Sequence, residues 1–500
     1  MASIFQAFPQ LRTAAPRLTC RLFVCRPCLN APLRTAAAPP RTSSTPVLRA
    51  VRWKSTQTSR SSISTASRSS QASILAHASA KGSGGSSSFP NTSSKSVAYW
   101  LLGSAASVFG IVVFGGLTRL TESGLSITEW RPVTGSLPPM SQADWDREFT
   151  KYQSSPEFIR LNSSMTLPEF KQIYWMEWTH RLWGRVIGVT FLVPTIYFIA
   201  RRRVASSMAL KLTGTCGMIG FQGFIGWWMV KSGLRDDLFA PGSHPRVSQY
   251  RLAAHLGAAF VVYCSMIHSG LSILKEHRLL ADPAKAAAAI EGLKHPALRL
   301  FRGSVTGLVF LVFTTAMSGA LVAGLDAGLI YNEFPWMGLG LTPPKKELFD
   351  PFYSHVPDHS DLWWRNMLEN PSLVQLDHRI LATTTFTAVV SLFAYTRFSA
   401  AVRGKLSRDA NKGMMGLVHL VWMQAALGIS TLLYMVPTWL AASHQAGALA
   451  LLTGAVVLHS RISMPRRAIM RQIFKSHPLQ TQAQPLRTRL DSAKKAQKFR

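Results

Sequence analysis

Eight apolar segments are the feature that most restricts how this chain of 500 residues can fold. Each holds about twenty mainly apolar residues, which as an α-helix are enough to cross about 30 Å of hydrocarbon. A buried soluble core is the alternative, but it rarely supplies so many such runs with polar flanks. We therefore predict eight transmembrane helices. They cover approximately residues 97–117, 178–200, 209–230, 250–274, 303–324, 378–397, 413–434 and 439–460.

The first ninety residues differ in composition from the rest of the chain. No Asp or Glu occurs before Glu122, whereas Arg, Ser, Thr and Ala are frequent. Such an acid-free, Arg- and Ser-rich N-terminus is typical of a mitochondrial or plastid transit peptide. We predict that residues 1–90 are a mitochondrial transit peptide and linker, and we exclude them from the fold. Three of the five cysteines lie there and two lie in apolar segments, so no disulfide framework is expected.

The distribution of charge predicts an orientation in the membrane. The formal net charge is +32, and the excess Lys and Arg lie in alternate connections, such as 201–203, and in the basic tail 461–500. Most acidic residues lie in the other connections. Because basic connections stay on the inner side, we predict both termini in the matrix. The tail is expected to contact anionic inner-membrane lipid, and no nucleic-acid partner is expected.

The chain also contains an internal repeat of four apolar segments. The parallels are Gly115–Arg119 and Gly124–Ser126 with Ser318–Val322 and Gly328–Ile330, Glu177–Gly184 with Gln375–Ala382, Gln222 and Gly226 with Gln424 and Gly428, and His255 with His444. Correspondences in the same order indicate a duplication, and equal span numbers make the repeats parallel. We predict an all-α integral membrane protein whose eight transmembrane helices form two parallel-repeat four-helix bundles. Their boundaries are residues 97–274 and 303–460.

Four histidines are predicted to lie at one depth in the membrane. They stand near the starts of the second, fourth, sixth and eighth segments: His180, His255, His378 and His444. A single histidine at a helix end is usually a packing residue, but two per repeat favour paired metal ligation. Imidazoles on facing helices can hold haem iron from both sides, whereas zinc sites show shorter spacings with Cys or carboxylate ligands. We predict a bis-histidine haem site in each half.

Charged residues stand beside these histidines. A guanidinium group pairs well with a haem propionate, although snorkelling at the lipid interface explains the same residues. The candidates are Arg181, Arg185, Arg251 and Arg379. Glu177, three residues before His180, has Gln375 as its counterpart, and a carboxylate there can accept a proton or stabilise a developing cation. This asymmetry predicts that one half works on a substrate and the other keeps a cofactor.

Several motifs resemble those of the haem A synthase family. They are Gly115–Ser126, Glu177–Arg185, Gln222–Trp228 and Arg251–Gly257 in the first half, and Gln375–Arg379 and Ser443–Gly447 in the second. The resemblance covers about residues 97–460 and is close to the mitochondrial members, which serve cytochrome c oxidase assembly.

The resemblance implies an oxidoreductase that converts the C8 methyl of haem O to a formyl group and yields haem A. It implies that His378 and His444 ligate a resident haem b. It also implies that His180 and His255 bracket the haem O substrate, with Glu177 as the essential carboxylate. Ferredoxin is the expected electron donor, haem O synthase the expected upstream partner, and a homo-oligomer a further candidate. Many bacterial members carry a cysteine pair in the first outer loop, but residues 118–176 contain none, so no thiol-based step is expected.

Two other functions remain open from the residues alone. A two-haem b-type electron-transfer protein, such as a quinol or ascorbate oxidoreductase, uses the same histidines but leaves Glu177 without a role. A transporter with parallel repeats places its binding groups at mid-membrane on broken helices rather than at one surface.

Overall fold

Helices account for the regular structure of the part of the chain that is described. The computed structural model describes residues 89–241 and 243–476, and no β-strand forms within these ranges. The predicted transit peptide lies outside the described residues except for its last two positions, and so does the end of the basic tail. The long helices are α2 (Lys95–Leu120), α5 (Leu167–Ala200), α6 (Ser206–Gly233), α7 (Gln249–Ala281), α9 (Pro296–Gly324), α11 (Pro371–Phe398), α12 (Arg408–Leu433) and α13 (Thr438–Ile462).

Shorter helices occupy connections that the apolar pattern leaves unassigned. They are α3 (Gln142–Gln153), α4 (Pro156–Leu161), α8 (Pro283–Leu293), α10 (Leu362–Glu369) and α14 (Arg467–Ser476). Within the predicted basic tail, α14 buries Ile469 and Ile473 against Ala286, Ala287 and Ile290 of α8. This part of the tail is therefore a packed amphipathic helix.

Helix α5 begins earlier than the sequence analysis predicts. The prediction starts the second span at residue 178, but α5 begins at Leu167, where a capping box joins Thr166 to Glu169 and a proline occupies the first turn. The first turns contain polar residues, so a search for apolar segments does not detect this part of the helix. His180 consequently lies more than three turns inside α5 rather than near its start.

Six segments are long and apolar enough to span a membrane. They are α2, α5, α7, α9, α12 and the segment Thr438–Ser476, which contains α13. The other two predicted spans, α6 and α11, are each 28 residues long. Gly, Ser and Thr lower the hydropathy of α6, and the polar run Gln375–Arg379 lowers that of α11.

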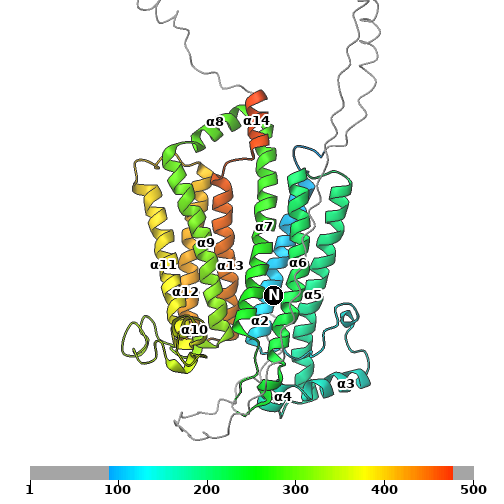
Figure 1. The fold of residues 1–500 in the computed structure, drawn as a ribbon. Coiled ribbons are helices and arrows are strands. Elements are labelled where there is room, and N and C mark those ends of the chain that lie inside the picture. The colour runs from blue at the N-terminus through cyan, green and yellow to red at the C-terminus, as the bar shows by residue number, and fades with distance from the viewer. Residues whose placement is uncertain (1–88, 242, 477–500) are drawn as a thin grey trace, which may run out of the picture. The chain divides into compact units, whose positions relative to one another are not determined.

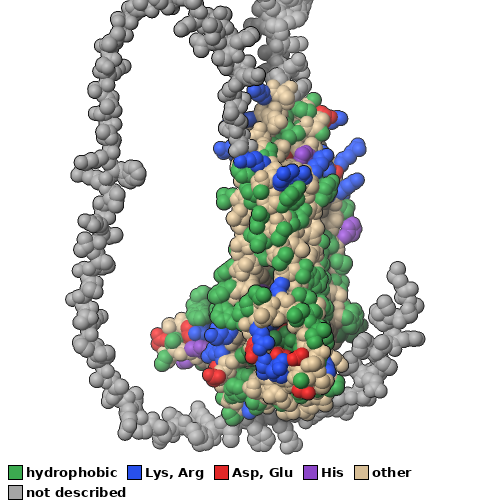
Figure 2. Space-filling model, turned by 90° about the vertical axis from the view of Figure 1, so that its right-hand side faces the viewer, with side chains coloured by type: hydrophobic (Ala, Val, Ile, Leu, Met, Phe, Trp, Pro, Cys, Tyr) green, Lys and Arg blue, Asp and Glu red, His purple; other side chains and the backbone are tan. Residues whose placement is uncertain are grey.

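The surface of the long helices is apolar in the middle. Figure 2 shows hydrophobic side chains along the length of one face, with Lys and Arg above them and mixed charges below. On α5, the exposed large side chains include Val186, Val189, Leu192, Val193 and Ile196. Aliphatic side chains exposed in this number fit a helix that faces lipid.

The long helices pack in two groups. In Figure 1, α2, α5, α6 and α7 form one group, and α9, α11, α12 and α13 form the other. Helices α7 and α13 make the junction, since α7 packs on both α9 and α13, and α13 packs on α2. A hydroxyl pair, Tyr263 and Thr453 at 2.7 Å, crosses this junction.

The start of α2 and the end of α13 lie at the same end of the long helices. The amide of Ser94 donates to the carbonyl of Arg203 at 2.8 Å, next to the α5–α6 connection. Arg466, after α13, donates to the carbonyl of Asn91 at 3.2 Å. Helices α3, α4 and α10 lie at the opposite end (Figure 1).

Candidate functional site

A large cavity brings the four predicted histidines together. Its volume is about 1770 Å³, and its walls come from both groups of helices. His180, His255, His378 and His444 all line it. Ordinary small-ligand pockets have volumes of about 300–1,000 Å³, so this cavity has room for a very large ligand or for more than one.

Each of these histidines rests on a glycine of the preceding long helix. The pairs are His180 on Gly115, His255 on Gly226, His378 on Gly319 and His444 on Gly428. A Cβ atom built on these glycines would lie 2.8, 3.1, 3.1 and 2.8 Å, respectively, from Cε1 of the histidine ring. The pairing aligns Gly115 with Gly319, one residue later than the Ser318 of the predicted alignment.

Gly428→Ala is expected to disturb the His444 ring. The new methyl group would meet Cε1 of His444 at 2.8 Å, and overpacking of this kind costs about 1–3 kcal/mol. The matched control is Gly416→Ala, on the same helix, where a Cβ meets nothing within 4 Å. If a haem binds His444, haem content per protein should fall in Gly428→Ala and stay normal in the control. Equal haem content in both variants would contradict the contact.

The two histidine rings of the second group lie close together. Their ring centroids are 6.5 Å apart, with the planes at 88°. A metal ion about 2 Å from one nitrogen of each ring would separate the centroids by roughly 6 Å. Nδ1 of His378 is 2.8 Å from the Ser318 hydroxyl, and Nδ1 of His444 is 3.0 Å from Nε2 of Gln424. The Ser318 hydroxyl donates to the carbonyl of Thr315 and can accept from Nδ1–H of His378, which leaves Nε2 of that ring for a metal. The amide nitrogen of Gln424 can only donate, so its contact positions the His444 ring without setting the tautomer of a metal ligand.

The two histidines of the first group lack this support. Nδ1 of His180 and Nδ1 of His255 are buried without a hydrogen-bond partner. The residue that corresponds to Ser318 is Phe114, whose ring stacks on His180 at a centroid distance of 6.4 Å. Gln222 donates to the backbone carbonyl of His255 at 2.8 Å, as Gln424 does to that of His444. The backbone arrangement is therefore shared by the two groups, but the ring contacts differ.

Glu177 is a fully bonded carboxylate in the cavity wall. It is 3% exposed, and its Oε2 accepts hydrogen bonds from the Ser126 hydroxyl and the Ile127 amide, both at 2.7 Å. Its Oε1 accepts from Nε and Nη2 of Arg181 at 3.0 and 2.6 Å. A bidentate guanidinium and two further donors occupy both oxygens of this carboxylate and hold it in one position. Glu177 therefore fixes the loop after α2 against α5.

The predicted arginines bind loop carbonyls in the structure. Arg181 donates to the carbonyls of Ile127 and Glu129, and Arg379 donates to those of the corresponding residues Tyr331 and Glu333. Buried carbonyl groups need donors, and these guanidinium groups supply them. A propionate contact of Arg181 or Arg379 stays a prediction.

The other two arginines differ in position. Arg185 lines the cavity and donates to the carbonyls of Pro132 and Arg131, while its Nη1 is buried without a partner. Arg251 does not line the cavity. It lies 4.3 Å from the ring centroid of Trp228 and donates to that residue's carbonyl. Of these two, Arg185 keeps a donor for a ligand.

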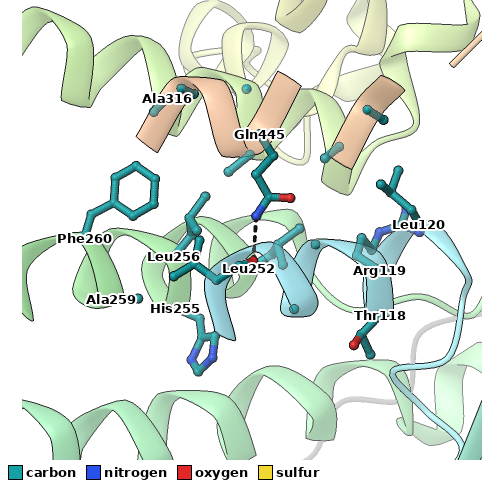
Figure 3. Close-up of a pocket in the computed structure, with 18 of the residues that line it drawn as sticks. Thr118, Arg119, Leu120, Leu252, His255, Leu256, Ala259, Phe260, Ala316 and Gln445 are labelled. Carbon is teal, nitrogen blue, oxygen red and sulfur yellow. Dashed lines mark hydrogen bonds between the residues drawn. The ribbon is translucent and has the colours of Figure 1, made fainter. Parts of the chain in front are cut away.

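Gln445 joins the two groups of helices next to the histidines. It follows His444 on α13, and its Nε2 donates to the carbonyl of Val112 on α2 at 2.9 Å, as the dashed line in Figure 3 shows. The absence of a side chain at Gly116 makes room for it, because a Cβ there would lie 1.6 Å from Oε1 of Gln445. His255 and Gln445 line the same cavity, so the two halves share one site.

Ser318, Phe114 and Gln445 were not predicted as residues of the site. Ser318 stands beside the corrected glycine of the repeat, so an alignment shifted by one residue would have paired it with Phe114. Gln445 has no such signal, because its partner is a backbone carbonyl 333 residues away.

The chain is similar to known proteins over most of its length. A family model described as "Cytochrome oxidase assembly protein" matches residues 98–456. "Heme A synthase COX15" of Saccharomyces cerevisiae is 50% identical over 386 residues, which are 77% of this chain and 79% of the yeast protein. The Homo sapiens protein of that name is 46% identical over 73% of this chain and 82% of its own length. A "Heme A synthase-mitochondrial ferredoxin fusion protein" of Schizosaccharomyces pombe is 51% identical over 74% of this chain and 60% of its own length.

Proposed function

Because the chain belongs to the haem A synthase family of cytochrome oxidase assembly proteins, we propose that its two halves divide the work of one reaction. As a haem A synthase, the protein is a multi-pass oxidoreductase of the mitochondrial inner membrane. It oxidises the C8 methyl of haem O to a formyl group, so haem O is the substrate and haem A the product.

The second half is proposed to hold a resident haem b. One observation carries this proposal: His378 and His444 each have an Nδ1 partner, whereas His180 and His255 have none. A permanent ligand gains from side chains fixed in advance, and the 6.5 Å ring separation fits two imidazoles on one iron. When bound, haem b supplies one-electron transfer to and from the neighbouring site.

The first half is proposed to receive haem O. His180 and His255 bracket the substrate, and rings without fixed partners suit a ligand that must enter and leave. Glu177 is proposed as the essential carboxylate of this half. Its bonds to Arg181 and to the loop after α2 place a negative charge beside the substrate and keep the cavity wall in position. The role of the protein side chains is orientation and charge, since the chemistry of oxidation belongs to haem.

The same proposal includes eight membrane spans in two parallel four-helix repeats. The shared glycine–histidine contacts, the matching Gln222 and Gln424 bonds and the matching loop bonds of Arg181 and Arg379 support the repeat. Both termini are proposed to face the matrix, because the start of α2 and the end of α13 meet at the end that carries the basic connections.

Ferredoxin is proposed as the electron donor. The fission-yeast relative is named as a fusion with mitochondrial ferredoxin, and fusion keeps a donor close to its acceptor. Haem O synthase is proposed as the upstream partner because it makes the substrate. A homo-oligomer and contact of the basic tail with lipid remain predictions.

Pigment extraction tests the proposed function. Membranes from cells that express the protein together with haem O synthase should yield haem A. Membranes from cells that express the protein without haem O synthase should yield no haem A. Haem b without haem A in both kinds of membrane would favour the electron-transfer alternative. Absence of haem from the purified protein would favour a transporter.

Ser318→Ala is expected to weaken haem b binding about 10- to 100-fold, because it removes a hydrogen bond that orients a metal ligand. Exposed Ser304 on the same helix provides the control, Ser304→Ala. Haem titration of the purified apoproteins measures the difference. Equal affinity in the two variants would show that the His378 ring needs no such partner.

A further inference from the structure

Glu157 is a buried acidic residue of the cavity that the proposed mechanism does not use. It lies on α4, which precedes α5 in the outer connection, and it is 4% exposed. Its Oε2 is buried without a hydrogen-bond partner. Glu157 lines the same cavity as Glu177 and His180. A buried carboxyl group that faces a ligand cavity without a partner is costly unless it is neutral or has a function.

The surroundings of Glu157 contain more negative than positive charge. Glu177 on α5 and Glu122 after α2 act on it electrostatically, and Arg119, a cation that acts in the opposite direction, is bound to Asp326 at 2.7 Å. The Tyr152 hydroxyl on α3 bonds to the carboxyl group of Glu157 and opposes part of this effect. On the neighbouring η2 (Asp236–Phe239), the acidic residues are exposed, and Asp237 pairs with Arg235. The pKa of Glu157 is raised to about 8, mainly because the group is buried and also because Glu177 and Glu122 are negatively charged.

Glu177 and Glu157 therefore differ in what they can do with a proton. Glu177 accepts hydrogen bonds from four donor groups, which occupy both of its oxygens. Glu157 lacks such donors at Oε2, and so keeps its proton at neutral pH. Glu122, which acts on Glu157 electrostatically, also lines the cavity and is exposed.

We propose that Glu157 passes protons between the haem O cavity and water at the cavity mouth. Oxidation of a methyl to a formyl group removes hydrogen from carbon and adds oxygen. Protons must therefore enter or leave the cavity, and this holds for any molecule that supplies the oxygen. In the relay, the O–H bond of Glu157 breaks as its proton moves to the cavity side. Water near Glu122 then returns a proton to the carboxylate, so the residue ends unchanged and no electrons move. The inference rests on the proposed binding of haem O in the first half.

Two variants and one control test this role. Glu157→Gln keeps the size of the side chain but cannot carry the proton, and Glu157→Asp keeps an acid on a shorter side chain. Glu148→Gln on α3 is the control, because Glu148 pairs with Lys151 and does not line the cavity. Loss of a positioned acid–base group lowers rates by about 10²–10⁴-fold, so haem A formation should fall about 10²-fold in Glu157→Gln. Glu157→Asp should recover part of the rate.

Infrared titration gives a readout that does not depend on turnover. The pKa of about 8 means that the acid is protonated below this pH and ionises above it. Wild-type protein should lose a protonated-carboxyl band as the pH rises through about 8, and Glu157→Gln should lack that band. The rate should fall over the same range in wild type and be independent of pH in Glu157→Gln.

Three results would overturn the relay. They are a wild-type rate in Glu157→Gln, an unchanged infrared band in that variant, or loss of haem b in both Glu157 variants, which would indicate a packing role. Failure of wild type itself to make haem A would instead contradict the proposed function.

Discussion

His378→Ala and His444→Ala should each abolish haem b binding. Either substitution removes one of two imidazoles whose centroids lie 6.5 Å apart, and it leaves the remaining ring with no opposite ligand. Each ring also rests on a glycine, which has no side chain that could replace the imidazole. The low-spin b spectrum of the purified protein should disappear, together with one haem per protein. Haem A formation should then stop, because the electron path is lost.

The matched control for these variants is His419→Ala. His419 lies on α12 with Gly428 but is exposed and does not line the cavity. It should keep the wild-type spectrum. An unchanged low-spin b spectrum in His378→Ala or His444→Ala would show that this pair does not hold the resident haem.

Glu177→Gln is expected to cause a second large loss. The amide cannot accept from both guanidinium nitrogens of Arg181 and from the two donors of the loop, so a buried cation loses its partner. Breaking a buried ion pair on one side costs about 3–5 kcal/mol. We expect haem A formation to fall by at least about 10²-fold, since one such electrostatic contact is worth about that much in rate. Haem b content should remain normal, because the substitution lies in the other half.

Exposed Glu333 in the corresponding loop of the second half offers the control, Glu333→Gln. Haem A output and haem b content are measured on the same preparations. Full haem A output in Glu177→Gln with normal haem content would remove Glu177 from the mechanism.

Most of the long helices were predictable, because a helix that faces lipid requires a long run of apolar residues in the sequence. The predicted span 209–230 lies within α6, and 439–460 lies within α13. The predicted start of α5 was wrong, because its first turns are polar and are stabilised by a helix cap rather than by an apolar face. Helices such as α4 and α14 pack on neighbouring elements, and a pattern that detects membrane spans does not detect them.

The histidines were predictable from the repeat, but their environment was not. The binding of haem propionates by arginines stays a prediction, and the structure adds that Arg379 and Arg181 bind loop carbonyls. The carbonyl groups of these loops need hydrogen-bond donors, and the side-chain pattern of a sequence does not show where the fold places such carbonyls. The contact of Ser318 with His378 joins residues 60 positions apart, so only the packed helices show it.

The most direct test of the division between the halves is a haem O titration of purified single-histidine variants. We expect that His378→Ala and His444→Ala protein, which lacks haem b, still binds haem O. We expect that His180→Ala and His255→Ala protein keeps haem b and loses haem O binding. The reverse result, haem O bound by the His180→Ala protein but not by the His378→Ala protein, would contradict the assignment of substrate and cofactor.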